Sequence, residues 1–266
     1  MSKEVKKQES KEISTHVDYS GYENAGYENQ SASDYTIPYI GVLQALSPQL
    51  ETLPNAKAGM LVNSVTNELY DGKSGFLFVP AITKHLYVEW VPKEAGGGLV
   101  GVHDASSDLV ITAQQNSAVW NELKTPKGND LVETFYMYGV ILGEDEQPLG
   151  FCMIPFSSTK IKVYKKINTK LRTFTLSLAD GRKIRPPLFA HKLRIASIKE
   201  KSTKGDYYNF LIEPAVHGDV KDSLIPVDHP AFLEAKKCSE MVNKGTIKID
   251  DTTLKQAQTD TEEVPF

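Results

Sequence analysis

Residues 134–154 read TFYMYGVILGEDEQPLGFCMI, two apolar runs separated by an acidic segment. The runs, 134–142 and 150–154, are rich in the aromatic and β-branched residues that favour strands. The polar residues 143–147 between them have the composition of a turn. The segment therefore predicts a β-hairpin.

The same strand-forming composition recurs on both sides of this hairpin. Residues 76–79 end at Pro80 and residues 86–91 end at Pro92, and because proline interrupts a ladder we expect two strands there. Residues 193–198 and 207–212 flank a Lys-Gly-Asp turn and predict a second hairpin.

Between the two hairpins the spacing of the apolar residues changes. They recur every three or four positions over residues 161–174, which predicts an amphipathic helix with a Ser-Ser-Thr N-cap at 157–159. Lys162, Lys166 and Lys170 are four residues apart and therefore share the outward face of that helix.

Together these elements predict a mainly β (α+β) fold: an OB-like Greek-key barrel with an internal amphipathic helix and disordered N- and C-terminal tails. Residues 1–33 are polar and poor in aliphatics, so we expect a disordered arm. Residues 34–245 form the predicted core, which ends in a short helix closed by Gly245. Residues 246–266 are a predicted tether and acidic tip. Whether the part before Gly75 is a separate domain stays open.

Charge is strongly segregated along the chain. The net charge of the whole sequence is −4. Residues 159–204 nevertheless hold fourteen Lys or Arg against two acidic residues, a net charge of +12 that leaves −16 for the remainder. Such segregation indicates what the protein binds rather than how it folds. One part of the molecule is expected to bind an anion, and another part to compete with that anion.

Aromatic residues interleave with the basic ones, which is the composition that single-stranded nucleic acid requires. Cations follow the phosphates, and aromatic faces stack on bases at about 1–3 kcal/mol each without demanding a sequence. Duplex-reading motifs such as zinc fingers, basic zippers or a helix-turn-helix are not recognisable. Two other interpretations stay open, because strand aromatics are often core residues and a lysine-rich helix face can serve solvation alone. The candidate DNA-binding residues are Lys160, Lys162, Lys165, Lys166, Lys170, Arg172, Arg182, Lys183, Arg185, Lys192, Arg194, Tyr87, Trp90 and Tyr207.

The sequence ends in a run of acids followed by an aliphatic-Pro-Phe tripeptide. This run resembles the C-terminal tip of bacterial single-stranded DNA-binding proteins, and phage proteins of the OB class also end in an acidic tail with a terminal Phe. The resemblance implies that Phe266 enters a hydrophobic pocket of a partner while the acids meet a basic rim. The candidate partner-binding residues are Asp260, Glu262, Glu263, Val264, Pro265 and Phe266.

The body of the chain resembles phage replication-cluster proteins regarded as single-stranded DNA binders. The resemblance rests on the order of Gly59, the strands within 76–90, Ser157-Ser158-Thr159-Lys160 and the final hairpin. It implies sequence-independent binding and protection of single-stranded DNA in replication, recombination and repair. The tail would recruit a polymerase, helicase or primase, and a phage-encoded protein of this kind would work in the host cytoplasm.

Other functional classes find little support in the sequence. There is no phosphate-binding loop, no nucleophile elbow and no metalloprotease motif, so we expect no catalytic residues, metal or cofactor. Cys152 and Cys238 are expected to be buried thiols in a reducing compartment. No apolar run is long enough to span a membrane, and the polar N-terminus is not a secretory signal. An adaptor that docks an acidic protein and a strand-annealing or nuclease-type protein remain alternatives, and the formation of a homo-oligomer stays open.

Overall fold

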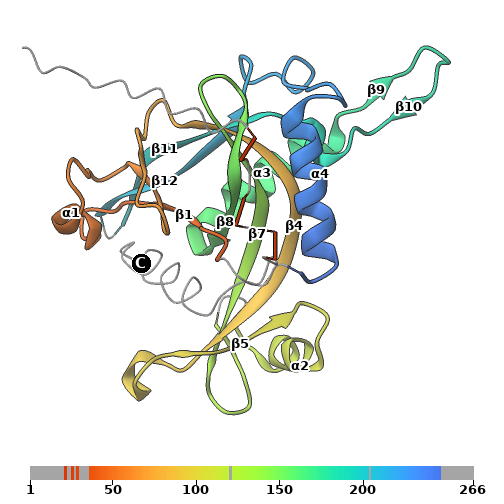
Figure 1. Ribbon diagram of the computed structural model, residues 1–266. Coiled ribbons are helices and arrows are strands. Elements are labelled where there is room, and N and C mark those ends of the chain that lie inside the picture. The colour runs from red at the N-terminus through yellow and green to blue at the C-terminus, as the bar shows by residue number, and fades with distance from the viewer. Residues whose placement is uncertain are drawn as a thin grey trace, which may run out of the picture.

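The computed structural model describes residues 21–22, 25–26, 28–29, 36–119, 122–203 and 205–246 (Figure 1). Most of the predicted N-terminal arm lies outside these residues. Lys204 and the predicted tether and tip beyond Thr246 lie outside them as well.

Two long antiparallel strands, β4 (Phe76–Trp90) and β7 (Asp130–Leu142), form the centre of the structure. β8 (Pro148–Ser157) pairs with β7, and β11 (Leu193–Ser202) pairs with the first residues of β4 and with β12 (Gly205–Pro214). At the other end of the sheet, β5 (Leu99–Asp104) pairs with β4, and β6 (Leu123–Lys124) pairs with β7. Figure 1 shows β4 running the length of the molecule between these two groups of strands. The two predicted hairpins, β7–β8 and β11–β12, are confirmed.

The two strands expected around Pro80 are in fact one continuous strand, β4. The register with β7 shifts between Pro80 and Ile82, so Ala81 forms a bulge. Pro80 lacks an N–H, but residues 79–85 of β4 pair only with β7. On their other side, the pairing with β11 ends at Phe78 and the pairing with β5 begins at Leu86. The missing donor therefore breaks no ladder there. The bulge also shifts the alternation by one residue, which keeps the apolar residues of both halves on the same face.

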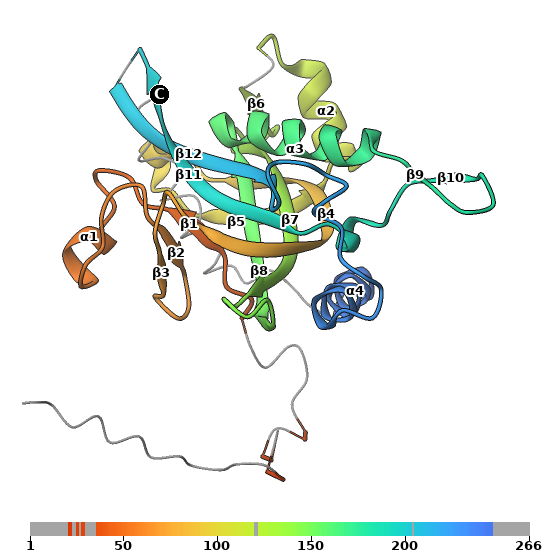
Figure 2. The ribbon, with the colours of Figure 1, turned by 90° about the horizontal axis from the view of Figure 1, so that it is seen from above.

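The sheet has a different helix on each face, α3 (Ile161–Thr173) on one and α4 (Pro230–Asn243) on the other (Figure 2). β7 supplies both cores by alternation. Tyr136 and Tyr138 pack toward α4, and Phe135 and Met137 pack into the core that α3 covers. Both faces of the central strands are thus buried.

An N-terminal layer packs against the edge of this sheet. It comprises β1 (Ile40–Val42), α1 (Gln49–Thr52), β2 (Leu61–Asn63) and β3 (Leu69–Tyr70), whose strands form a three-stranded sheet. β1 contacts both β8 and β12. The side-chain amide of Gln44, which is buried, donates to the Tyr208 carbonyl at 2.8 Å and accepts from the Tyr208 N–H at 2.9 Å. This pair of bonds holds the layer on β12.

Two excursions leave the central sheet. η2 (Lys93–Ala95), β5, α2 (Asp108–Asn116) and β6 form a lobe between β4 and β7, with a small core around Val110. β9 (Leu176–Ser177) and β10 (Lys183–Ile184) form a hairpin after α3, and η4 (Leu188–Ala190) leads from it to β11.

The predicted fold class is confirmed at the level of a mainly β, antiparallel structure with few helices. The amphipathic helix is confirmed as α3. It begins at Ile161 after a 3-10 turn, η3 (Ser158–Lys160), and the predicted serine and threonine side chains do not cap it. A closed barrel is not formed within the described residues, because β8 and β12 do not pair with each other.

Candidate nucleic-acid interface

α3 presents a basic face to solvent. Its apolar residues Tyr164, Ile167 and Leu171 are buried against the sheet, because their three- and four-residue spacing places them on one side of the helix. The opposite side carries the exposed cations Lys162, Lys165, Lys166 and Arg172. Lys162, Lys166 and Lys170, which were predicted to share the outward face, are all exposed, and Lys165 and Arg172 lie beside them.

The β9–β10 hairpin extends this basic surface beyond the end of α3. Only Phe174 and Thr175 separate the helix from β9, and Figure 2 shows the hairpin projecting away from the body at the C-terminal end of α3. Arg182, Lys183 and Arg185 are all exposed on it. Helix and hairpin together form what we call the α3–hairpin surface.

Several predicted DNA-binding cations are already engaged by the protein. Arg182 pairs with Asp180 at 2.6 Å, and Lys170 donates to the Gly218 carbonyl at 2.6 Å. Lys192 and Arg194 lie outside the α3–hairpin surface at the start of β11. They pair with Glu146 at 2.6 Å and with Glu213 at 3.1 Å. In the described part of the chain, five predicted cations of the α3–hairpin surface have neither a carboxylate within 4.0 Å nor a side-chain hydrogen bond: Lys165, Lys166, Arg172, Lys183 and Arg185.

Two of the predicted residues, Lys162 and Tyr207, bind the same carboxylate near the start of α3. Glu200 on β11 accepts from Lys162 at 2.7 Å, from the Tyr207 hydroxyl at 2.5 Å and from Asn209 at 3.2 Å. Burial alone would raise the pKa of Glu200, but the three hydrogen bonds and the Lys162 charge outweigh it and lower that pKa. The ionised Glu200 thus ties α3 to the β11–β12 hairpin, and Tyr207 is held in this network with its ring buried.

Three other candidates lie in the interior. Tyr87 packs under α2 and accepts a hydrogen bond from Gln114 at 3.0 Å, and Trp90 belongs to the core beneath α4. The side chain of Lys160 is buried, with its Nζ 5.7 Å from the centre of the Phe210 ring. Because adjacent strand residues of opposite parity face opposite sides, Tyr87 and Trp90 enter different cores. Neither ring presents a face on which a base can stack in this conformation.

A row of stacked rings supports the middle of α3. Phe135 lies between His85 and Tyr164, with ring centres 4.1 Å and 4.5 Å away. Lys165 Nζ lies 5.4 Å from the centre of the Phe135 ring. A cation over an aromatic face is stabilised by about 0.5–1 kcal/mol at an exposed site, so Lys165 is oriented by the protein yet remains exposed to solvent.

A cavity of about 440 Å³ lies at the C-terminal end of α3. It is lined by Lys170, Thr173, Phe174 and the loop 218–221, which brings Lys221 beside the predicted basic residues. Sequence reasoning missed Lys221, because it lies beyond β12 and outside the basic segment, residues 159–204. Only the tertiary structure brings it there.

Among the described residues, the thiols and carboxylates give no sign of a metal centre. Cys152 and Cys238 are buried and unbonded, and burial raises the pKa of both. Within the described ranges, no three His, Cys, Asp or Glu side chains are grouped so that they could bind a metal ion. In the same residues, every helix is too short or too polar to cross a bilayer.

The fold and this surface define a mainly antiparallel β protein with a basic helix and hairpin exposed on one side. The chain matches the model of the Pam3 phage gp34-like protein family over residues 5–248, and it belongs to that family. The name of the family indicates a bacteriophage protein. Comparison with curated proteins and with solved structures gives no match.

Proposed function

We propose that this protein binds single-stranded DNA without strong sequence preference and that the α3–hairpin surface carries the strand. The observation on which this rests is the group of five exposed cations without carboxylate partners, all on one helix and the hairpin that follows it. Lys162, Arg182, Lys192, Arg194 and Lys199 of residues 159–204 are instead neutralised by ion pairs. Phosphates would satisfy the unpaired group and release the counterions that it holds.

The order of the strands favours an OB-derived architecture. β4, β7 and β8 form a meander, α3 follows, and β11 returns beside β4 with β12 paired on its other side. This is the sequence of elements of an OB fold, a partly open five-stranded Greek-key barrel. β1 contacts the two strands that would close such a barrel, β8 and β12. We therefore infer an OB-type barrel in which β1 fills the gap.

The proposed path of the single-stranded DNA follows from the face of the sheet that α4 covers. An OB fold commonly binds oligonucleotides on the outer face of its second and third strands, which correspond to β7 and β8 here. That face is occupied by α4, whose Ala235 and Cys238 are fully buried in the core that contains Tyr138 and Met153. No helix of the described residues covers the α3–hairpin surface in this way, and the helical part of that surface is about 20 Å long.

An anisotropy titration tests the proposal. Fluorescein-labelled dT20 should bind at low salt, and the equivalent duplex should bind more weakly. The slope of log K against log salt should be about −3.5, because five neutralised phosphates contribute about 0.7 each. The triple variant Lys165→Glu/Lys166→Glu/Arg172→Glu should weaken binding by roughly tenfold or more for dT20 and for a mixed sequence alike.

A control triple variant separates this site from a general effect of charge. Lys127→Glu/Lys236→Glu/Lys244→Glu changes the net charge by the same amount at exposed positions outside the α3–hairpin surface, so it should lose far less affinity. Failure of the wild-type protein to bind dT20 in dilute buffer would overturn the proposal. Equal losses in both triple variants would place the strand elsewhere. Shortening of the labelled DNA with Mg²⁺ would favour the nuclease alternative.

The proposed role of the acidic tip in recruiting a replication protein remains a prediction from the sequence. Residues 260–266 lie outside the described residues. The predicted competition between this tip and DNA for the basic surface rests on the effective concentration of a tethered group, which is millimolar in order of magnitude for short flexible linkers.

A further inference from the structure

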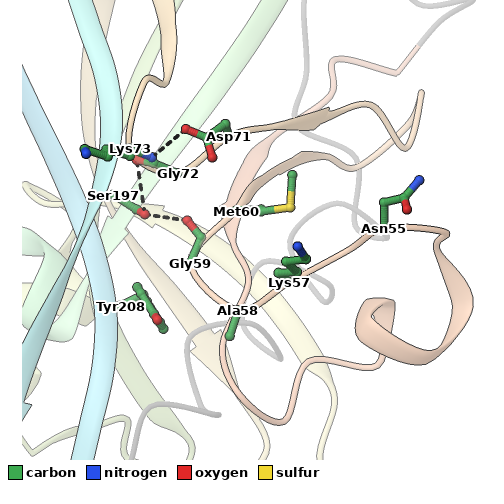
Figure 3. Close-up of a pocket in the computed structure, with 10 residues that line it drawn as sticks. All are labelled: Asn55, Lys57, Ala58, Gly59, Met60, Asp71, Gly72, Lys73, Ser197 and Tyr208. Atoms are coloured by element: carbon green, nitrogen blue, oxygen red, sulfur yellow. Dashed lines mark hydrogen bonds between the residues drawn. The ribbon is translucent and has the colours of Figure 1, made fainter.

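A second cavity lies between the N-terminal layer and the β11–β12 hairpin (Figure 3). No residue of α3 lines it. Its volume is about 470 Å³, which falls within the range of small-molecule binding pockets, about 300–1,000 Å³. The loops 55–60 and 71–73 supply one side of it, and Ser197 and Tyr208 supply the other.

The floor of this cavity is rigidly built. A Cβ on Gly59 would lie 2.5 Å from the Tyr208 ring, and one on Gly72 would lie 2.0 Å from the Gly59 carbonyl oxygen. Ser197 links the two glycines, because its hydroxyl donates to the Gly59 carbonyl and its N–H donates to the Gly72 carbonyl at 2.7 Å. The Gln44 amide fixes the Tyr208 backbone from behind. Two glycines at this close approach bring the loops onto the strands.

The lining of the cavity combines an aromatic ring with cations. The Tyr208 ring is half-buried, and Lys57 and Lys73 are exposed at the rim, with no carboxylate of the described residues within 4.0 Å of either ammonium group. The nearby Asp71 carboxylate is committed to its own turn, where it accepts from the Ser74 N–H at 2.8 Å and from the Lys73 N–H at 3.1 Å. Asn55 adds a side-chain amide at the rim.

We propose that this cavity is a nucleotide subsite: one base of a single strand lies against Tyr208, and its flanking phosphates meet Lys57 and Lys73. The inference rests on the proposed function, and it adds a DNA contact made by residues outside the basic segment 159–204. A base and a phosphate require an aromatic face and cations within reach of each other, and the preformed floor lowers the ordering cost of binding.

The test uses the full chain and dT20 that carries one photoreactive 5-iodouracil. Ultraviolet cross-linking should attach the oligonucleotide to the peptide that contains Tyr208. Tyr208→Leu should lower the affinity for dT20 roughly five- to hundredfold, since a stacked base contributes about 1–3 kcal/mol. Tyr208→Phe keeps the ring and should bind like the wild type. Lys57→Ala/Lys73→Ala should weaken binding and reduce the salt slope by about 1.4, at about 0.7 per phosphate.

The outcomes separate this inference from the proposed function. Lys236→Ala/Lys244→Ala, two exposed lysines at the α4 end of the chain, should leave the affinity and the cross-link unchanged. If the wild type binds dT20 but Tyr208→Leu and Lys57→Ala/Lys73→Ala bind equally well, and the cross-link lies elsewhere, only the subsite is overturned. If the wild type does not bind dT20, the proposed function fails. In that case, the absence of NMR shifts from Tyr208 on titration with thymidine monophosphate overturns the subsite as well.

Discussion

A single buried histidine, His191, makes the free energy of unfolding fall at acidic pH. The His191 side chain is buried, its Nδ1 has no hydrogen-bond partner among the described residues, and burial lowers its pKa to about 4. The unfolded chain would protonate His191 below about pH 6.5, but the folded protein would not. The contribution of neutral His191 to the free energy of unfolding is therefore fully present above about pH 6.5, and it is lost as the pH falls toward 4. The loss from this group is at most about 3 kcal/mol.

Urea unfolding at pH 7.5 and pH 5.0 measures this effect. The wild type should lose about 2 kcal/mol of unfolding free energy from His191 between these two values. His191→Phe removes the titrating group from a site beside Phe174, so the difference between the two pH values should shrink by that amount. His217→Asn at an exposed position should retain the wild-type difference. An undiminished pH dependence in His191→Phe would contradict this account.

At the scale of single residues, charge was easier to predict than the surroundings of aromatic rings. The exposed face with Lys165, Lys166 and Arg172 follows from helical spacing alone. The burial of Trp90 depends on α4, which lies more than 130 positions further along the chain. The half-exposed Tyr208 likewise depends on Gly59, a close approach between segments remote in sequence. Local patterns carry no information on such contacts.

At the scale of elements, the pairing of β4 with β7 depends on a glycine. Gly139 lies opposite Pro80, and a Cβ there would lie 2.3 Å from both Phe78 Cζ and the Val79 carbonyl oxygen. Because a backbone atom cannot move aside cheaply, Gly139→Ala should destabilise the protein by about 1–3 kcal/mol. Urea denaturation at pH 7.5 measures this change. Gly150→Ala on β8, where no neighbour lies within 4 Å, should be neutral or slightly stabilising.

The elements themselves could be predicted wherever a local pattern defines them. Both hairpins and the α3 helix follow from alternation and period, and α4 follows from its proline and Gly245. The continuity of β4 could not be predicted, because Pro80 ends a strand unless one of its edges is unpaired. That edge is unpaired only because β11 and β5 share the same side of β4. This arrangement is set by pairing between remote segments.

For the whole molecule, the fold divides the +12 segment into two populations of cations. One population forms ion pairs within the protein, such as Lys192–Glu146 and Arg194–Glu213, which link strands and turns to each other. The other faces solvent on α3, on the β9–β10 hairpin and at Lys201 of β11. A net charge read from sequence thus overstates the cations available to a ligand, because it cannot tell which side chains find carboxylates in the fold.

Lysine footprinting tests this division across the whole chain in one experiment. Acetylation in the presence of saturating dT20, read out by mass spectrometry, should spare Lys165, Lys166 and Lys183, because bound phosphates would shield their ammonium groups. The exposed residues Lys236 on α4 and Lys244 just after it should react as they do without DNA, since α4 itself fills the outer face of β7 and β8. Protection of Lys236 and Lys244 with full reactivity of the α3 lysines would instead mean that α4 lifts away and the strand takes the face that it covers.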